Sequence, residues 1–173
     1  MKHDKYVIFF VGGMKPAHRG HYDAINQYSG HQSVEEVLII QGKTPREGVL
    51  GEDMVQRFNT FGGFPKNTFY VFSDEGESPI STVHRLVKDE AFLRAYDKDV
   101  TYAIGASDKT GASERTLQFP EYYKKRPGIL PDNVKVGTPP FIAKTLMNKD
   151  GEPISATAIR AQMRAAKNKI FSY

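Results

Sequence analysis

The sequence contains no cysteine and no tryptophan. Without cysteine the chain can form neither disulfide bridges nor Cys-ligated zinc and iron–sulfur sites, and it has no thiol nucleophile. The sequence also has no long apolar run near its start. The first apolar run, residues 6–11, is too short for a membrane span or a signal peptide core. We therefore expect a cytoplasmic protein that is not bound to a membrane.

Charge of one sign is not in large excess either. The 24 Lys and Arg residues exceed the 20 Asp and Glu residues by four, and a hydrophobic content of 39% is enough for a buried core. These values exclude a chain that is disordered throughout. A small positive excess favours small anionic ligands such as phosphates, and it does not favour nucleic acid. With no internal repeat and no linker, the chain is expected to form one domain, residues 1–173.

Apolar runs alternate with amphipathic stretches along the chain. Strands are predicted at residues 6–11, 34–41, 68–72 and 100–104, with a short fifth at 133–136. Helices are predicted at residues 22–28, 53–61 and 157–166, and a further one begins at Ser78 and continues through Leu93. This alternation predicts an α/β fold, in which helices cover both faces of a parallel sheet. Ligands of such sheets bind at the carboxyl ends of the strands.

The turn after the first strand has the densest chemistry. Gly12 and Gly13 allow the backbone to approach a ligand, and the helix that follows adds its positive dipole end, so the turn can hold a phosphate. His18 and His21 are three residues apart. If the helix begins near Arg19, both project from one face of its first turn, where they can donate hydrogen bonds to a phosphate. Two ordinary surface histidines and a zinc site are the alternatives, although the spacing is not that of a His-Glu-x-x-His zinc site.

Further polar residues follow the second strand and precede the last helix. Ser155 or Thr157 can cap that helix and leave N–H groups free for an anion, and Arg160 lies one turn further along. Lys43 and Arg46 lie after the second strand, where they can neutralise a phosphorylated substrate, although loop cations are often simply solvated.

The sequence His18-Arg19-Gly20-His21, preceded by Gly12-Gly13 and Pro16, resembles the HxGH signature of the nucleotidylyltransferase superfamily. Near the C-terminus, Ile154-Ser155-Ala156-Thr157-Ala158-Ile159-Arg160 resembles the ISSTxIR element of the same superfamily. With Gln162-Met163 after it, this element is most similar to the nicotinamide mononucleotide adenylyltransferase branch. Two motifs in this order are more specific than one. The resemblance covers essentially the whole chain and implies a single Rossmann-like domain.

The resemblance implies a reaction and a role for each motif. A nucleoside monophosphate, AMP in this branch, would pass from a nucleoside triphosphate to a phosphorylated acceptor with release of pyrophosphate. His18 and His21 would bind the transferring and bridging phosphates, and the second motif would hold the leaving pyrophosphate through Ser155, Thr157 and Arg160. Mg²⁺ is expected to arrive with the triphosphate, so no site made by the protein alone is expected for it.

Two further parts of the sequence relate to the same superfamily. Gly105 and Asp108 match its Gly-x-x-Asp region, which lies beside the ribose and the base. Lys15 lies where phosphates of the substrates are expected, in place of the Asp, Asn or Gln that is common before Pro16, and Met14 replaces an aromatic residue.

Three alternatives stay open on the sequence. Cytidylyl transfer to a phosphorylated alcohol or sugar is close to adenylyl transfer, and a non-catalytic nucleotide-binding protein would keep the same phosphate site. An RNA-binding module is suggested by the tyrosines before Lys124-Lys125-Arg126, although a basic surface helix is the simpler interpretation of residues 110–127, which could also form a lid. A P-loop is excluded, because its first glycine is replaced by Val37, and no strand is followed by Gly-x-Gly-x-x-Gly. A homo-oligomer is compatible with the sequence.

Overall fold

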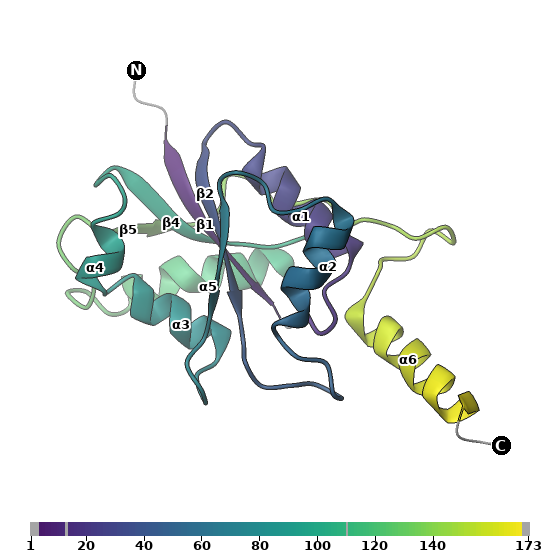
Figure 1. The fold of residues 1–173 in the computed structure, drawn as a ribbon. Helices are drawn as coiled ribbons and strands as arrows, with labels where there is room; N and C mark the ends of the chain where they lie inside the picture. Colours follow the sequence, from purple (N-terminus) through teal and green to yellow (C-terminus); the bar gives the residue numbers. More distant parts are fainter. Residues whose placement is uncertain (1–3, 13, 110, 171–173) are drawn as a thin grey trace.

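The computed structural model describes residues 4–12, 14–109 and 111–170, and its centre is a five-stranded sheet. The strands are β1 (Lys5–Gly12), β2 (Val34–Gln41), β3 (Thr68–Phe72), β4 (Val100–Gly105) and β5 (Lys135–Gly137). All of them pair in parallel, in the order β3-β2-β1-β4-β5 (Figure 1). The predicted α/β class and its Rossmann-like parallel sheet are confirmed.

Helices cover both faces of this sheet (Figure 1). On one face α1 (Arg19–Ser29) and α2 (Asp53–Phe61) pack in the same cluster as Ile8 and Phe10 of β1. On the other face α3 (Pro79–Leu86), α4 (Glu90–Leu93) and α5 (Ala112–Lys124) pack in a cluster with Val7 and Phe9. Successive side chains of a strand point to opposite faces, so the continuous apolar run of β1 contributes to both cores.

Most predicted boundaries agree with the structure, and the differences have local causes. The bounds of β2, α2 and β3 are those predicted. The single helix predicted from Ser78 through Leu93 is wrong, because Asp89 accepts hydrogen bonds from the N–H groups of Ala91 and Phe92 and thereby begins a new helix, α4. The fifth strand begins at Lys135 rather than at Asn133.

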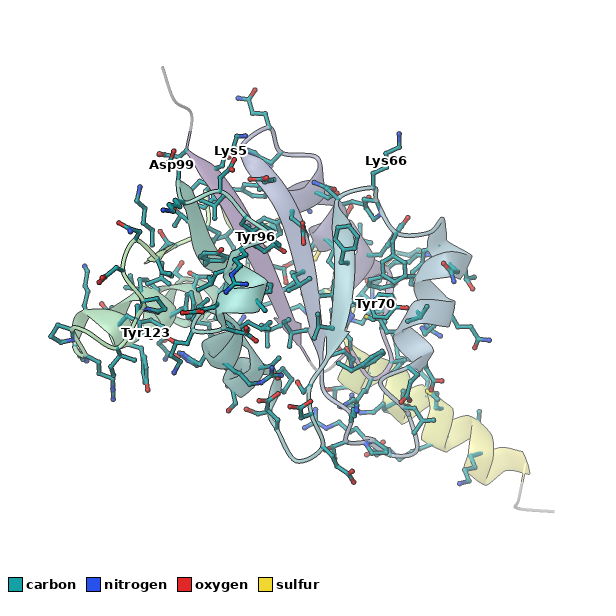
Figure 2. The ribbon with its side chains drawn as sticks, turned by 60° about the vertical axis from the view of Figure 1, so that its left-hand side comes forward. Lys5, Lys66, Tyr70, Tyr96, Asp99 and Tyr123 are labelled. Atoms are coloured by element: carbon teal, nitrogen blue, oxygen red, sulfur yellow. The ribbon has the colours of Figure 1, made fainter. Side chains whose placement is uncertain are left out.

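The segment after β4 forms a helix packed on the sheet. Residue 110 lies outside the described residues, and residues 112–124 form α5. The basic run is exposed as predicted, but only Lys124 of it belongs to the helix, because Lys125 is the C-cap residue. Phe119 and Tyr123 of this helix are buried. The hydroxyl of Tyr123, which is labelled in Figure 2, lies 2.6 Å from Nδ1 of His84.

The last helix, α6 (Ala156–Ile170), projects from the body of the molecule (Figure 1). Most of its described side chains are exposed. Within the described part of the chain, no helix is long and apolar enough to cross a membrane.

Candidate active site

The carboxyl ends of β1 and β4 lie side by side at the centre of the sheet. From β1 the chain continues into α1 on one face, and from β4 it continues into α5 on the other face. This reversal makes the place a topological switch point, where open α/β sheets bind ligands. Of the predicted residues, His18 and His21 lie at the start of α1, and Gly105 and Asp108 end β4 or closely follow it.

His18 and His21 form a stacked pair at the N-terminus of α1. Their ring centroids are 3.7 Å apart and their planes differ by 21°. His18 is the N-cap residue, since its Nδ1 accepts hydrogen bonds from the N–H groups of Gly20 at 3.0 Å and His21 at 3.4 Å. The Nδ1 of His21 accepts in turn from the His18 N–H at 3.2 Å. The pair is therefore a capping box made of two imidazoles, which is why α1 begins earlier than residue 22.

These hydrogen bonds determine the protonation of both rings. A backbone N–H always donates, so each Nδ1 is unprotonated and a neutral ring has its proton on Nε2. Burial, together with the charges of Lys109 and Arg57, lowers the pKa of His18 to about 4. Burial and the neighbouring His18 hold the pKa of His21 well below its ordinary value. At neutral pH the site therefore has two uncharged imidazoles that can donate through Nε2–H.

The Nε2 atom of His18 is buried and has no hydrogen-bond partner within the described residues. His18 lines a small cavity of about 10 Å³ with Ser107 and Lys109, which follow β4, and with Thr145 and Ile154, which precede α6. This volume is close to the minimum that one water molecule needs. A buried donor without a partner costs about 1–3 kcal/mol, so an acceptor atom at this place would stabilise the site.

The absence of a side chain has a different physical reason at each glycine of the site. A Cβ at Gly20 would lie 2.8 Å from Cε1 and 2.9 Å from Nδ1 of His18, so this glycine makes room for the ring rather than for a ligand. A Cβ at Gly105 would lie 2.7 Å from Cγ2 of Ile8, which gives Gly105 a packing role. At Gly12 the nearest atom is 3.8 Å away, in Met14. The predicted contribution of Gly13 lies outside the described residues.

The start of α6 lies against the connection between β1 and α1, 145 residues away in the sequence. The guanidinium of Arg160 donates to the carbonyl oxygen of Lys15 at 2.7 Å and to Oγ1 of Thr157 at 3.2 Å. Ser155 caps α6, since its Oγ accepts from the N–H of Ala158 at 3.0 Å. The second sequence motif is therefore in contact with the β1–α1 connection, which leads into the first motif.

Asp108 and Lys109 hold the segment between β5 and α6 in place. Oδ1 of Asp108 accepts from the N–H of Thr145 at 2.6 Å, and the Asp108 N–H donates to the carbonyl oxygen of Ala143 at 2.7 Å. Nζ of Lys109 donates to the carbonyl oxygen of Ile154 at 3.3 Å. The carboxylate of Asp108, which the resemblance places beside a ribose, thus binds the backbone of the loop at Thr145. Lys109 is a cation of the site that sequence analysis missed, although it directly follows the Gly-x-x-Asp pattern.

A second cavity, of about 470 Å³, lies at the carboxyl ends of β1 and β2. Gly12, Lys15 and Arg46 line it, together with the start of α3. The Lys15 side chain is buried, its Nζ donates to the carbonyl oxygen of Thr44, and burial followed by the charge of Arg46 lowers its pKa. Lys43 is exposed and is not one of the residues that line this cavity.

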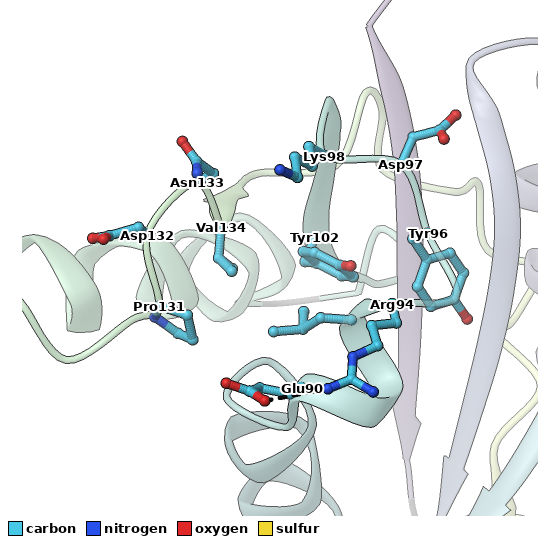
Figure 3. Close-up of a pocket in the computed structure, with 11 residues that line it drawn as sticks. Glu90, Arg94, Tyr96, Asp97, Lys98, Tyr102, Pro131, Asp132, Asn133 and Val134 are labelled. Carbon is cyan, nitrogen blue, oxygen red and sulfur yellow. Dashed lines mark hydrogen bonds and ion pairs between the residues drawn. The ribbon is translucent and has the colours of Figure 1, made fainter.

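A cavity of about 580 Å³ lies at the opposite end of the sheet, next to the amino ends of β4 and β5 (Figure 3). Tyr96 and Tyr102 form part of its wall, and Arg94 pairs with Glu90 at 3.5 Å beside it. It contains none of the predicted site residues, and within the described part of the chain no buried side-chain atom without a partner lines it. The predicted site residues therefore lie away from this cavity, toward the carboxyl ends of the strands.

A comparison with protein-family models finds no match for this chain, and a comparison with characterised proteins finds none either. The site itself consists of two imidazole donors and the cations Lys109 and Arg160, beside the start of α6. Backbone N–H groups, imidazole donors and guanidinium groups all bind anions. The residues are therefore suited to a ligand with several phosphate groups.

Proposed function

We propose that this protein is a nucleotidylyltransferase that transfers a nucleoside monophosphate, with AMP as the first candidate, from a nucleoside triphosphate to a phosphorylated acceptor. The proposal depends above all on the buried, unpartnered Nε2 of His18, stacked on His21 beside the start of α6. The resemblance of residues 154–163 to the nicotinamide mononucleotide adenylyltransferase branch makes a nicotinamide-type mononucleotide the first candidate acceptor. Cytidylyl transfer to a phosphorylated alcohol or sugar is the second.

The reaction needs no covalent intermediate on the protein. An oxygen of the acceptor phosphate attacks the α-phosphorus, the bond from this phosphorus to the α–β bridging oxygen breaks, and pyrophosphate leaves. The protein aligns two anions and stabilises the charge that develops between them. His18 and His21 would donate from Nε2 to the transferring and bridging phosphates. Arg160 would bind the leaving pyrophosphate, beside the N-terminus of α6 with its two hydroxyl residues.

The cavity lined by Gly12, Lys15 and Arg46 is the place that we assign to the acceptor. It adjoins the β1–α1 connection and has two cations for a phosphate group. Mg²⁺ would be bound mainly by phosphate oxygens and water, as is usual for this ion. Within the described part of the chain, no three His, Asp or Glu side chains form a cluster that could hold a metal, so no step is assigned to a metal bound by the protein.

Replacing His21 with alanine tests the assignment. One preorganised donor to the transition state commonly contributes a hundredfold to a thousandfold in turnover, so His21→Ala is expected to lose roughly that much pyrophosphate release. The matched control is His31→Ala near the other end of α1, where the ring packs against Phe141 and Nδ1 contacts Ser33. Turnover like that of the wild type in His21→Ala would overturn the assignment.

A non-catalytic nucleotide-binding protein is the second candidate, because Met14 and Lys15 replace the residues that are common beside the phosphate site in the superfamily. A thermal-shift screen of ATP, CTP, GTP and UTP with Mg²⁺, repeated with phosphorylated acceptors, identifies the ligands. Pyrophosphate release with the same pairs then separates the two candidates, because a binding protein shows a thermal shift without release.

A further inference from the structure

Two arginines one turn apart on α6 converge on a single carboxylate. The guanidinium of Arg164 donates to both carboxylate oxygens of Glu47, and Nε of Arg160 lies 4.0 Å from Oε2 of the same residue. Glu47 belongs to the connection between β2 and α2, so this contact joins the projecting helix to the body of the molecule. A groove of about 460 Å³ between them is lined by these three residues together with Val49, Met163 and Lys167.

Glu47 lies at the tip of a tight hairpin. Arg46 and Val49 exchange two backbone hydrogen bonds, each of 3.0 Å, and the two residues between them, Glu47 and Gly48, have φ angles of 51° and 80°. A type I′ turn requires positive φ at both central positions, and it prefers Asn, Asp or Gly at the first of them. Glutamate is not favoured there by turn geometry. The longer carboxylate side chain therefore has to be explained by what it reaches, which is the pair of arginines.

The contact contributes little to stability. The side chains of Glu47 and Arg164 are 44% and 55% exposed, and an exposed ion pair stabilises a protein by about 0–1 kcal/mol. An interaction this weak can be exchanged for a stronger one. The groove has three cations, Arg160, Arg164 and Lys167, against the one carboxylate, so an anion with several charges is a better partner for it than Glu47.

We propose that Arg164 is a polyphosphate-binding residue alongside Arg160, and that the Glu47 carboxylate occupies the two guanidinium groups until phosphate groups displace it. A guanidinium fork fits carboxylate and phosphate oxygens equally well, so Glu47 stands in for a phosphate in the free protein. The inference rests on the proposed function for the source of the anion, the β and γ phosphates of a nucleoside triphosphate. Ligand binding would then release the hairpin at residues 46–49 from α6.

Calorimetric titration of inorganic tripolyphosphate, at low salt to limit screening, tests the exchange. Glu47→Gln removes the competing carboxylate and is expected to tighten the Kd roughly twofold to fivefold. Arg164→Gln is expected to weaken it about tenfold, and Glu47→Gln should then give no further gain in an Arg164→Gln background. The matched control is Glu90→Gln, which breaks a similar exposed pair with Arg94 at the opposite end of the molecule and should leave the Kd unchanged.

The outcomes separate this inference from the proposed function. Three results would overturn the inference: affinity for tripolyphosphate that is unchanged or weaker in Glu47→Gln, affinity that is unchanged in Arg164→Gln, or no tripolyphosphate binding by any variant. Each of them does so even if the wild type releases pyrophosphate from a triphosphate. The expected pattern of Kd values without any pyrophosphate release supports the anion site and overturns the transferase. Thermal unfolding followed by circular dichroism shows whether each variant is folded. If Arg164→Gln is not folded, Arg164→Lys replaces it; this variant keeps the charge without the guanidinium fork and is expected to bind tripolyphosphate with intermediate affinity.

Discussion

Replacing Gly20 with alanine should distort the histidine pair, because the added Cβ would enter space that the His18 ring fills. It would lie 2.8 Å from Cε1, about 0.7 Å short of the normal contact distance between carbon atoms. The ring is confined, since it also stacks on His21 with centroids 3.7 Å apart. A shift of that size away from position 20 would lengthen the hydrogen bond from the Gly20 N–H, now 3.0 Å, to about 3.7 Å, which is beyond hydrogen-bonding range.

Three contributions determine the net change in the free energy of unfolding. Overpacking costs about 1–3 kcal/mol, and loss of the N-cap costs about 1 kcal/mol. Alanine in place of a helical glycine returns up to about 1 kcal/mol. The Gly20→Ala variant is therefore expected to lose about 1–3 kcal/mol of stability, which lowers the Tm by roughly 3–10 °C for a chain of this size.

Thermal unfolding measured by circular dichroism gives the loss of stability, and NMR titration of the imidazoles reports on His18. Gly12→Ala is the matched control, because a Cβ there would have no neighbour closer than 3.8 Å, so its Tm should change less. A Gly20→Ala protein that is as stable as the wild type, with the pKa of His18 still near 4, would refute the steric reasoning. Under the proposed reaction the variant should also lose about a hundredfold in turnover.

Two further predictions concern the pH dependence of stability. Burial lowers the pKa of His18 to about 4, so between about pH 6.5 and pH 4 the unfolded chain binds more protons than the folded one. Stability should be lost as the pH falls through this window, and the loss should be smaller in His18→Gln; equal slopes of Tm against pH in the two proteins would contradict this. Hydrogen bonds from Arg85 and Thr82 lower the pKa of Glu77 to about 2, so its stabilising contribution is present above about pH 4.5 and is lost as the pH falls toward 2. Glu77→Gln should flatten the Tm curve in that range, and an unchanged curve would show that the carboxylate contributes nothing.

The strands could be predicted from sequence because burial on both faces leaves a continuous apolar run. Apolar spacing alone places the start of α1 at Tyr22 instead of Arg19, and the reason is equally definite. N-caps are recognised in a sequence as Ser, Thr, Asp or Asn, and here the acceptor is an imidazole nitrogen of His18. The break between α3 and α4 has a signal in the sequence, the N-cap residue Asp89, which the apolar spacing through Leu93 does not reveal.

The position of the site could also be predicted, whereas most of its contacts could not. A glycine-rich turn after a buried strand has to lie at the carboxyl end of the sheet, so the position of His18 followed from the order of elements. The contact of Arg160 is different, because its partner is the backbone carbonyl oxygen of Lys15. Every residue has such an oxygen, so the sequence has no signal for this contact. The contact of Glu47 with Arg164 could not be predicted either, because tertiary packing determines which residues lie near the hairpin.

Because the two histidines are neutral, different residues of the site provide its hydrogen-bond donors and its positive charge. Because each Nδ1 accepts a backbone N–H, an imidazolium could form only by giving up the cap of α1. The pair therefore supplies directed donors without charge, and charge must come from elsewhere. Lys109 and Arg160 supply it from segments that are remote in sequence and join at the start of α6. A variant that disturbs α6 should thus weaken binding of anions while leaving the histidines neutral, and one that disturbs the cap should alter the donors while leaving the cations in place.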